Sequence, residues 1–86
     1  MATAVTETSK EDHWHITKLC GTWGSTPKLI AVAEIDAERA LGLDSPYLSG
    51  GFEILAVRDP KVPAGVFLRT APSAGPKWKL ENLPDC

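Results

Sequence analysis

The chain has 86 residues, of which 43% are hydrophobic and 23% charged, and its formal net charge is −2. This length suits one small domain that buries only about 60–65% of its unfolded surface, so we expect a thin core stabilised by association. The slight acidity gives no overall attraction to nucleic acid or to an anionic membrane, and no apolar run reaches the roughly 18 residues of a membrane-spanning helix.

The N-terminal segment shows no hydrophobic periodicity. Residues 1–12 are small, polar and charged, a composition typical of segments that cannot bury enough apolar surface to fold. The segment also lacks the basic and apolar regions of a secretory signal, although a trimmed chain could have lost one. Two cysteines make no disulfide framework, which favours a reducing, cytoplasmic location. We therefore predict a disordered tail over residues 1–12 and a single small β domain over residues 13–86.

Residues 13–23 alternate well enough to predict the first strand of this domain. One face of this strand carries Trp14, Ile16 and Cys20, and the other carries His13, His15, Thr17 and Leu19. The following stretch, Gly24–Pro27, contains two strong turn formers and is predicted to be a turn.

Leu29–Ile35 admits two interpretations. Its three β-branched residues and short apolar run favour a strand, which is the interpretation we prefer. The alternative is a helix that starts after Pro27 and runs to Leu41. In the preferred interpretation a short helix, Asp36–Leu41, is capped by its own first residue and ends at Gly42 in the left-handed conformation.

The second half of the chain predicts three further strands. Phe52–Arg58 and Val66–Thr70 alternate and flank a turn with two prolines, which predicts a hairpin. Lys77–Glu81 places Trp78 inward between two lysines, as expected for a protected edge strand. The whole chain is therefore mostly β with one short helix, in the order β-β-α-β-β-β. Its short connections favour a small barrel or a strongly twisted antiparallel sheet.

Two histidines and two cysteines are the candidate reactive residues. His13 and His15 project from one strand face, but zinc needs three or four ligands and no spacing supplies the others. Cys20 is expected to be a buried thiol in a reducing setting. Cys86 is expected to be exposed and mobile, free to form an intermolecular bond, unless it ties the C-terminus to the first strand. We predict no metal, cofactor or catalytic residue.

Charge is distributed unevenly along the chain. Residues 58–79 carry five bases and one acid, whereas residues 34–53 carry five acids and one base. Such a polarised surface favours head-to-tail self-association or docking onto a charged protein. A tryptophan in a glycine-flanked turn is either a further contact residue or a cover over the thin core. The predicted partner-binding residues are Trp23, Arg58, Lys61, Arg69, Lys77 and Lys79.

Four segments between residues 29 and 70 occur in a distinctive order: Ala37–Leu43, Ser49–Gly51, Phe52–Val57 and Gly65–Arg69. This layout resembles the swapped-hairpin transcription regulators of the AbrB type, which implies an intertwined dimer. The DNA-contacting positions of that family do not carry over. Glu38 stands where the family has a helical arginine, Leu29–Ile30 where it has Gly-Arg, and Ala33–Glu34 where it has Ile-Pro.

These features favour a non-catalytic interaction module that binds a protein partner or assembles with itself, preferably as a dimer. We expect no membrane partner. One alternative is a nucleic-acid-binding regulator of AbrB-like type that uses the basic surface of residues 58–79. This alternative predicts binding that weakens steeply with salt. A second alternative is a small oligomeric enzyme whose site forms between subunits.

Overall fold

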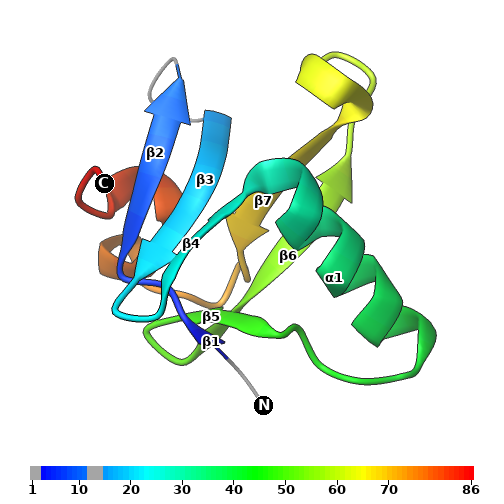
Figure 1. Cartoon of the computed structure of the whole chain (residues 1–86), viewed down its shortest axis with the longest axis horizontal. Coiled ribbons are helices and arrows are strands. Elements are labelled where there is room, and N and C mark those ends of the chain that lie inside the picture. Colours follow the sequence, from blue (N-terminus) through cyan, green and yellow to red (C-terminus); the bar gives the residue numbers. More distant parts are fainter. Residues whose placement is uncertain (1–2, 12–14) are drawn as a thin grey trace.

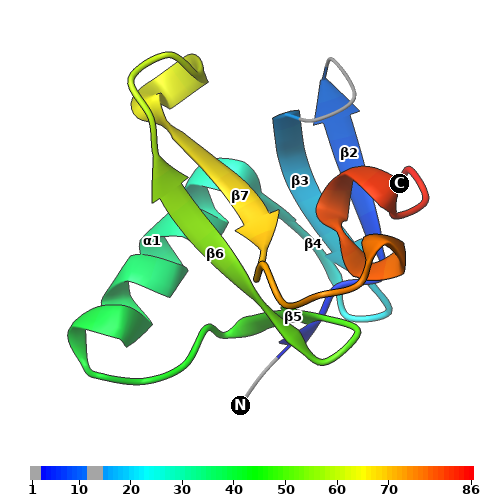
Figure 2. The same cartoon turned by 180° about the vertical axis from the view of Figure 1, so that it is seen from behind.

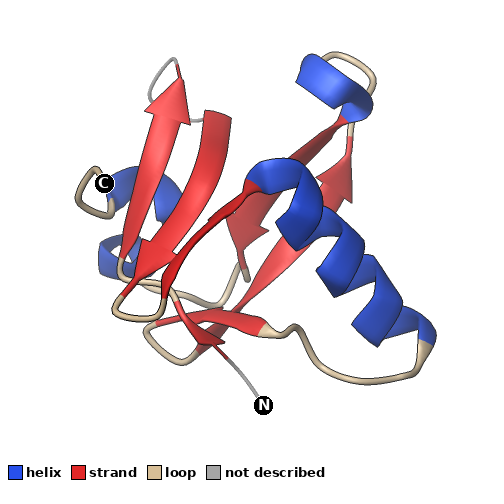
Figure 3. Cartoon of the chain, in the orientation of Figure 1, coloured by secondary structure: helices blue, strands red, loops and turns tan. Residues whose placement is uncertain are grey.

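A computed structural model describes residues 3–11 and 15–86 (Figure 1). In these residues, strands precede and follow a single α-helix, which confirms the predicted mostly-β class (Figure 3). The strands are β1 (Thr3–Ala4), β2 (Glu7–Glu11), β3 (His15–Gly21), β4 (Gly24–Pro27), β5 (Tyr47–Ser49), β6 (Phe52–Arg58) and β7 (Val66–Thr70). The helix is α1 (Lys28–Ala40), and the 3-10 helices are η1 (Pro63–Gly65), η2 (Pro76–Trp78) and η3 (Leu80–Asn82).

The strands form two twisted sheets, with the orders β1-β5-β6-β7 and β2-β3-β4. Neighbouring strands are antiparallel except for β1 and β5, which run parallel. Neither sheet closes on itself, so the twisted-sheet form of the prediction describes this fold and the barrel form does not. In the described part of the chain, no helix combines the length and apolar character needed to cross a membrane.

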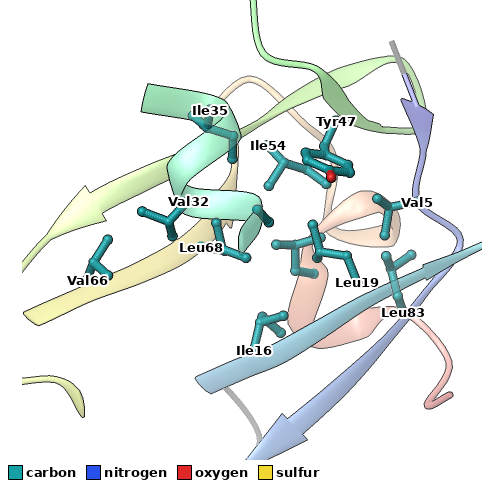
Figure 4. Close-up of a cluster of buried hydrophobic side chains, with 12 residues drawn as sticks. Val5, Ile16, Leu19, Val32, Ile35, Tyr47, Ile54, Val66, Leu68 and Leu83 are labelled. Carbon is teal, nitrogen blue, oxygen red and sulfur yellow. The ribbon is translucent and has the colours of Figure 1, made fainter. Parts of the chain in front are cut away.

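The core lies where α1 packs between the two sheets (Figure 4). Strand alternation in β6 and β7 turns Ile54 and Leu68 toward the helix, which contributes Val32 and Ile35. Val5, in the connection between β1 and β2, also belongs to this cluster, and β3 of the second sheet adds Ile16 and Leu19. The buried core residues are Val5, Ile16, Leu19, Ala31, Val32, Ile35, Tyr47, Ile54, Val66, Leu68, Leu80 and Leu83.

The N-terminal segment belongs to the fold. Val5 and Thr8 are only 2% and 0% exposed, and β2 pairs with β3 along its whole length. The predicted disordered tail over residues 1–12 is therefore wrong for residues 3–11, while residues 1, 2 and 12 lie outside the described part. A polar sequence forms a strand here because β2 is held mainly by backbone hydrogen bonds to β3. The hydrophobic periodicity of a sequence does not indicate such bonds, so it could not predict this strand.

The predicted first strand is confirmed for His15–Gly21, but its faces differ from strict alternation; His13 and Trp14 lie outside the described residues. A register shift in the pairing with β2 leaves one extra residue on β3, so Ile16 and Leu19 both reach the core. The predicted turn at Gly24–Pro27 is wrong, because these residues form β4, which pairs with β3.

Two other element predictions are corrected. Leu29–Ile35 is helical, so the strand preferred from the sequence is wrong and the alternative of a longer helix is right. Helical spacing buries Lys28, Val32 and Ile35 on one side, which outweighs the strand propensity of the β-branched residues. Lys77–Glu81, predicted as an edge strand, instead lies in η2 and η3, where Pro76 occupies the first helical position.

A disulfide joins Cys20 of β3 to Cys86, with a Cα–Cα distance of 6.4 Å. The expectation of a free buried thiol and a mobile C-terminal thiol is therefore wrong, and the alternative, a link from the C-terminus to the first strand, is right. The C-terminal residues run beside β2, where Thr8 forms a parallel bridge with Asp85 and its carbonyl accepts a bond from the Cys86 N–H. Figure 2 shows the C-terminal segment against this sheet.

Candidate functional site

Helix α1 has apolar side chains on two of its sides. One side packs into the core through Ala31, Val32 and Ile35. At about 100° of rotation per residue, the residues from Leu29 to Leu41 that face away from the core lie within an arc of roughly 120°. We call this surface the outer helix face; it consists of Leu29, Ile30, Ala33, Ala37, Ala40 and Leu41, and we include the exposed Leu43 that follows just past the helix end.

The large side chains of the outer helix face are strongly exposed. Leu29 and Ile30 are 58% and 53% exposed, and Leu41 and Leu43 are 74% and 55% exposed. The outward side of a surface helix normally carries polar residues, and a contiguous apolar patch marks a contact site. Ala37 gives the middle of the surface low relief, which allows close approach of a partner.

The C-terminal end of α1 holds its leucines in place. Gly42 has a φ of +76°, the left-handed conformation that the sequence predicted at this position. Its N–H donates to the Arg39 carbonyl, and the Leu43 N–H donates to the Glu38 carbonyl at 2.9 Å. This cap fixes the backbone on both sides of the glycine, so the conformation of the turn keeps Leu41 and Leu43 exposed.

The N-terminal end of α1 is anchored by a buried lysine. The Nζ of Lys28 lies 2.6 Å from Nε2 of His15 and donates to the Val66 carbonyl at 3.0 Å. Burial lowers the pKa of Lys28, and the charge of Glu11 opposes this effect. The anchor connects the helix to β3 and β7, so the outer helix face is carried on a fixed element.

The rim of the outer helix face is acidic. Glu34 accepts a hydrogen bond from the Tyr47 hydroxyl at 2.8 Å, and Asp36 forms an ion pair with Arg58. Burial, followed by the hydrogen bond and charge of Glu34, raises the pKa of Tyr47. Within residues 3–11 and 15–86, neither Glu34 nor Glu38 forms a salt bridge.

Trp23, the predicted aromatic contact, is 39% exposed but already has partners within the chain. Its Nε1 donates to the Ala4 carbonyl at 2.6 Å, and its ring centroid lies 6.1 Å from that of Tyr47. The ring also lies against Gly21, where an added Cβ would come within 2.3 Å of Nε1. Trp23 therefore covers the junction of β1 and β3.

The five predicted basic contacts do not form one surface. Arg58 is paired with Asp36, and the Lys77 Nζ lies 4.9 Å from the Trp78 ring centroid. Lys61 is exposed in the turn that connects β6 and β7. Only Arg69 and Lys79 come together, on the lining of a hollow of about 310 Å³ beside β7.

The outward side of the β6–β7 hairpin carries a second apolar surface. Glu53, Leu55 and Val57 alternate with the inward Ile54 and do not belong to the core cluster. Leu55 and Val57 are half-buried, and the Glu53 carboxylate accepts a hydrogen bond from the Ser45 N–H at 2.8 Å. Leu55 is paired in register with the exposed Arg69. We call Leu55, Val57 and Arg69, with Lys79 beside them, the outer hairpin face.

Chemical candidates are few in the described part of the chain. No three His, Cys, Asp or Glu side chains there gather closely enough to hold a metal ion, and His13 lies outside that part. No family model matches the chain, and no curated protein or solved structure is significantly similar to it. The site residues that sequence reasoning missed are those of the outer helix face. Their helical spacing was the available signal, and the preference for a strand concealed it.

Proposed function

We propose that the protein is a non-catalytic interaction module whose contact surface is the outer helix face. The observation that carries this proposal is the exposure of Leu29, Ile30 and Leu41 on a helix whose opposite side already fills the core. In an isolated copy, a second apolar side on such a helix stays in contact with water, which is unfavourable. The low relief at Ala37 and the fixed helix ends favour binding with little rearrangement.

The energetics support this function. Burying one leucine or isoleucine side chain completely contributes about 1.5–3 kcal/mol. The four large side chains of the outer helix face are each more than half exposed, so covering them contributes about 4–7 kcal/mol before the entropy of association. A domain with a core this thin benefits directly from that contribution, because binding to the folded state stabilises it.

The buried hydroxyl groups support the non-catalytic part of the proposal. Ser49 Oγ and Thr70 Oγ1 both donate to the Trp78 carbonyl, at 2.7 and 2.8 Å. Thr8 Oγ1 donates to the Leu80 carbonyl at 3.0 Å, and Ser45 Oγ donates to the Ile54 carbonyl at 2.7 Å. These groups hold the C-terminal segment and the β5–β6 connection to the sheets, which is a structural task.

The disulfide bears on the location of the protein. Disulfides persist in oxidising compartments and are rare in the cytoplasm. We therefore propose that the protein works in an oxidising setting rather than in the cytoplasm that the sequence favoured. Alkylation of intact cells before lysis tests this: a chain with both cysteines protected from the reagent is expected, and an alkylated Cys86 would place the protein in the cytoplasm.

The sequence-based alternatives remain predictions. The ion pair between Arg58 and Asp36 leaves fewer free cations for the nucleic-acid-binding regulator. Retention of the chain on a nucleic-acid column at 50 mM salt and release as salt increases would favour that alternative. An intertwined dimer of AbrB-like type predicts a dimer that survives substitution of Leu41. An enzyme with a site between subunits predicts a cofactor or metal that copurifies with the oligomer.

A photo-crosslinking experiment tests the proposed function. A benzophenone amino acid replaces Ala37 in the full chain, and the protein is irradiated in extract from its source. We expect adducts with a polypeptide, either a second copy or another protein, that disappear when Leu41→Glu is added. The matched control places the benzophenone at the exposed Lys61. Equal yields at the two positions would contradict the function.

A further inference from the structure

The two outer faces lie on opposite sides of the molecule. Helix α1 is in front of β6 and β7 in Figure 1, and the same strands are in front of α1 in Figure 2. The helix packs on the inward side of the hairpin through Ile35 and Ile54, so its outward side and that of the hairpin point in opposite directions. A partner on one face therefore leaves the other accessible.

The two faces are complementary in chemistry. The outer helix face is apolar with the acidic residues Glu34 and Glu38 at its rim. The outer hairpin face is apolar, and its basic residues Arg69 and Lys79 share the lining of one hollow with a single acid, Glu81, so this lining keeps a net positive charge. In the described residues, none of these four charged side chains forms a salt bridge. Charges of opposite sign that form no salt bridge, placed beside apolar side chains on both faces, favour one orientation of approach.

Pairing of the outer helix face with itself is less favourable. A two-fold axis that brings two antiparallel copies of α1 together places equivalent rims side by side. Glu34 and Glu38 of one copy would then approach the same residues of the other copy, and like charges at a contact are destabilising. The acidic rim therefore selects an occupant with basic residues around an apolar surface.

We propose that this occupant is the outer hairpin face of a second copy of the chain, which makes the module self-assembling in a head-to-tail manner. The inference rests on the proposed function and names its partner. Because the two faces point in opposite directions, one contact does not close the assembly, and further copies add at both ends. The product is an open chain of copies whose mean length increases with concentration.

Two variants, each damaged in one face, test the proposal. The helix-face variant carries Leu29→Lys and Leu41→Lys, and the hairpin-face variant carries Arg69→Glu and Lys79→Glu. All four positions are exposed, so the substitutions leave the core unchanged. Lys61→Glu in the β6–β7 turn is the matched control for reversal of a basic charge. Circular dichroism spectra that match the wild type establish that each variant is folded.

Light scattering after size-exclusion chromatography gives the readout. We expect the wild type and Lys61→Glu to increase in mass with concentration, and each double variant to stay at the monomer mass of 9.2 kDa. An equimolar mixture of the two double variants is expected to form particles of twice that mass, because each variant supplies the face that the other lacks. A mixture that stays monomeric would overturn the proposal, as would a wild-type dimer that the hairpin-face variant leaves intact.

The outcomes also separate this inference from the function on which it rests. A wild type that is monomeric at several hundred micromolar, yet forms Ala37 adducts with a different protein, overturns head-to-tail assembly and leaves the interaction function standing. A monomer that forms no Ala37-specific adduct overturns both.

Discussion

Replacing Cys86 by serine opens the covalent loop that the disulfide closes between β3 and the C-terminus. The two cysteines are separated by 66 residues, and closing a loop of this length lowers the entropy of the unfolded chain enough to stabilise the fold by about 4 kcal/mol. A domain of this size has a total free energy of unfolding of about 4–13 kcal/mol. The bond therefore accounts for a third or more of the stability.

Urea denaturation followed by tryptophan fluorescence measures the effect. With an m-value of about 1 kcal/mol/M for a chain this small, Cys86→Ser is expected to lower the urea midpoint by about 3–4 M. Dithiothreitol should lower the wild-type midpoint to the same value and leave the variant unchanged. Asp85→Ser is the control, because it perturbs the same segment and its ion pair with Lys10 but keeps the disulfide. A shift below about 0.5 M on reduction would refute the reasoning.

Three further changes have defined outcomes. Ile35→Ala is expected to lower the free energy of unfolding by about 2–4 kcal/mol, because Ile35 is buried, whereas the exposed Ile30→Ala changes it by less than about 0.5 kcal/mol. Urea titrations measure both values, and similar losses for the two variants would contradict the helix register. The pKa of Tyr47 is raised in the folded state, so the wild type should lose stability above pH 10.0, where this tyrosine ionises in the unfolded chain only. If the melting temperature of Tyr47→Phe falls between pH 9 and 11 by as much as that of the wild type, this cause is excluded. Gly50 has a φ of +58° and an added Cβ would lie 2.1 Å from the Trp78 ring, so Gly50→Ala should lower the melting temperature by several degrees, and an unchanged melt would rule this contact out.

Elements whose own side chains settle the structure were predictable from the sequence. The β6–β7 hairpin follows from clean alternation, and Gly42 ends the helix where its conformational freedom predicts. The helix beginning at Lys28 was misjudged because local propensity favours a strand at Ile30 and Val32. The packing of Val32 and Ile35 against the hairpin, which the sequence does not display, decides the outcome.

Elements that depend on distant partners were not predictable. β2 has a polar sequence and forms because β3 and the C-terminal residues supply backbone partners, one of them the Pro84 carbonyl that accepts from the Thr8 N–H. The disulfide likewise depends on this arrangement. For the candidate site, the charge asymmetry was visible along the chain. The sequence did not show that Arg69 lies near Lys79 or that Arg58 pairs with Asp36, because both arrangements depend on the tertiary fold.

The bond between Cys20 and Cys86 turns most of the chain into a covalent ring. Helix α1 and the β6–β7 hairpin both lie within this ring, as does the exposed connection at residues 72–73. A protease that cuts the ring once opens it without releasing a fragment, so the helix and the hairpin stay on one molecule until a reductant separates the pieces. Loss of either surface by a single cleavage therefore requires reduction as well, and the nicked chain runs as one species on a gel until thiol is added.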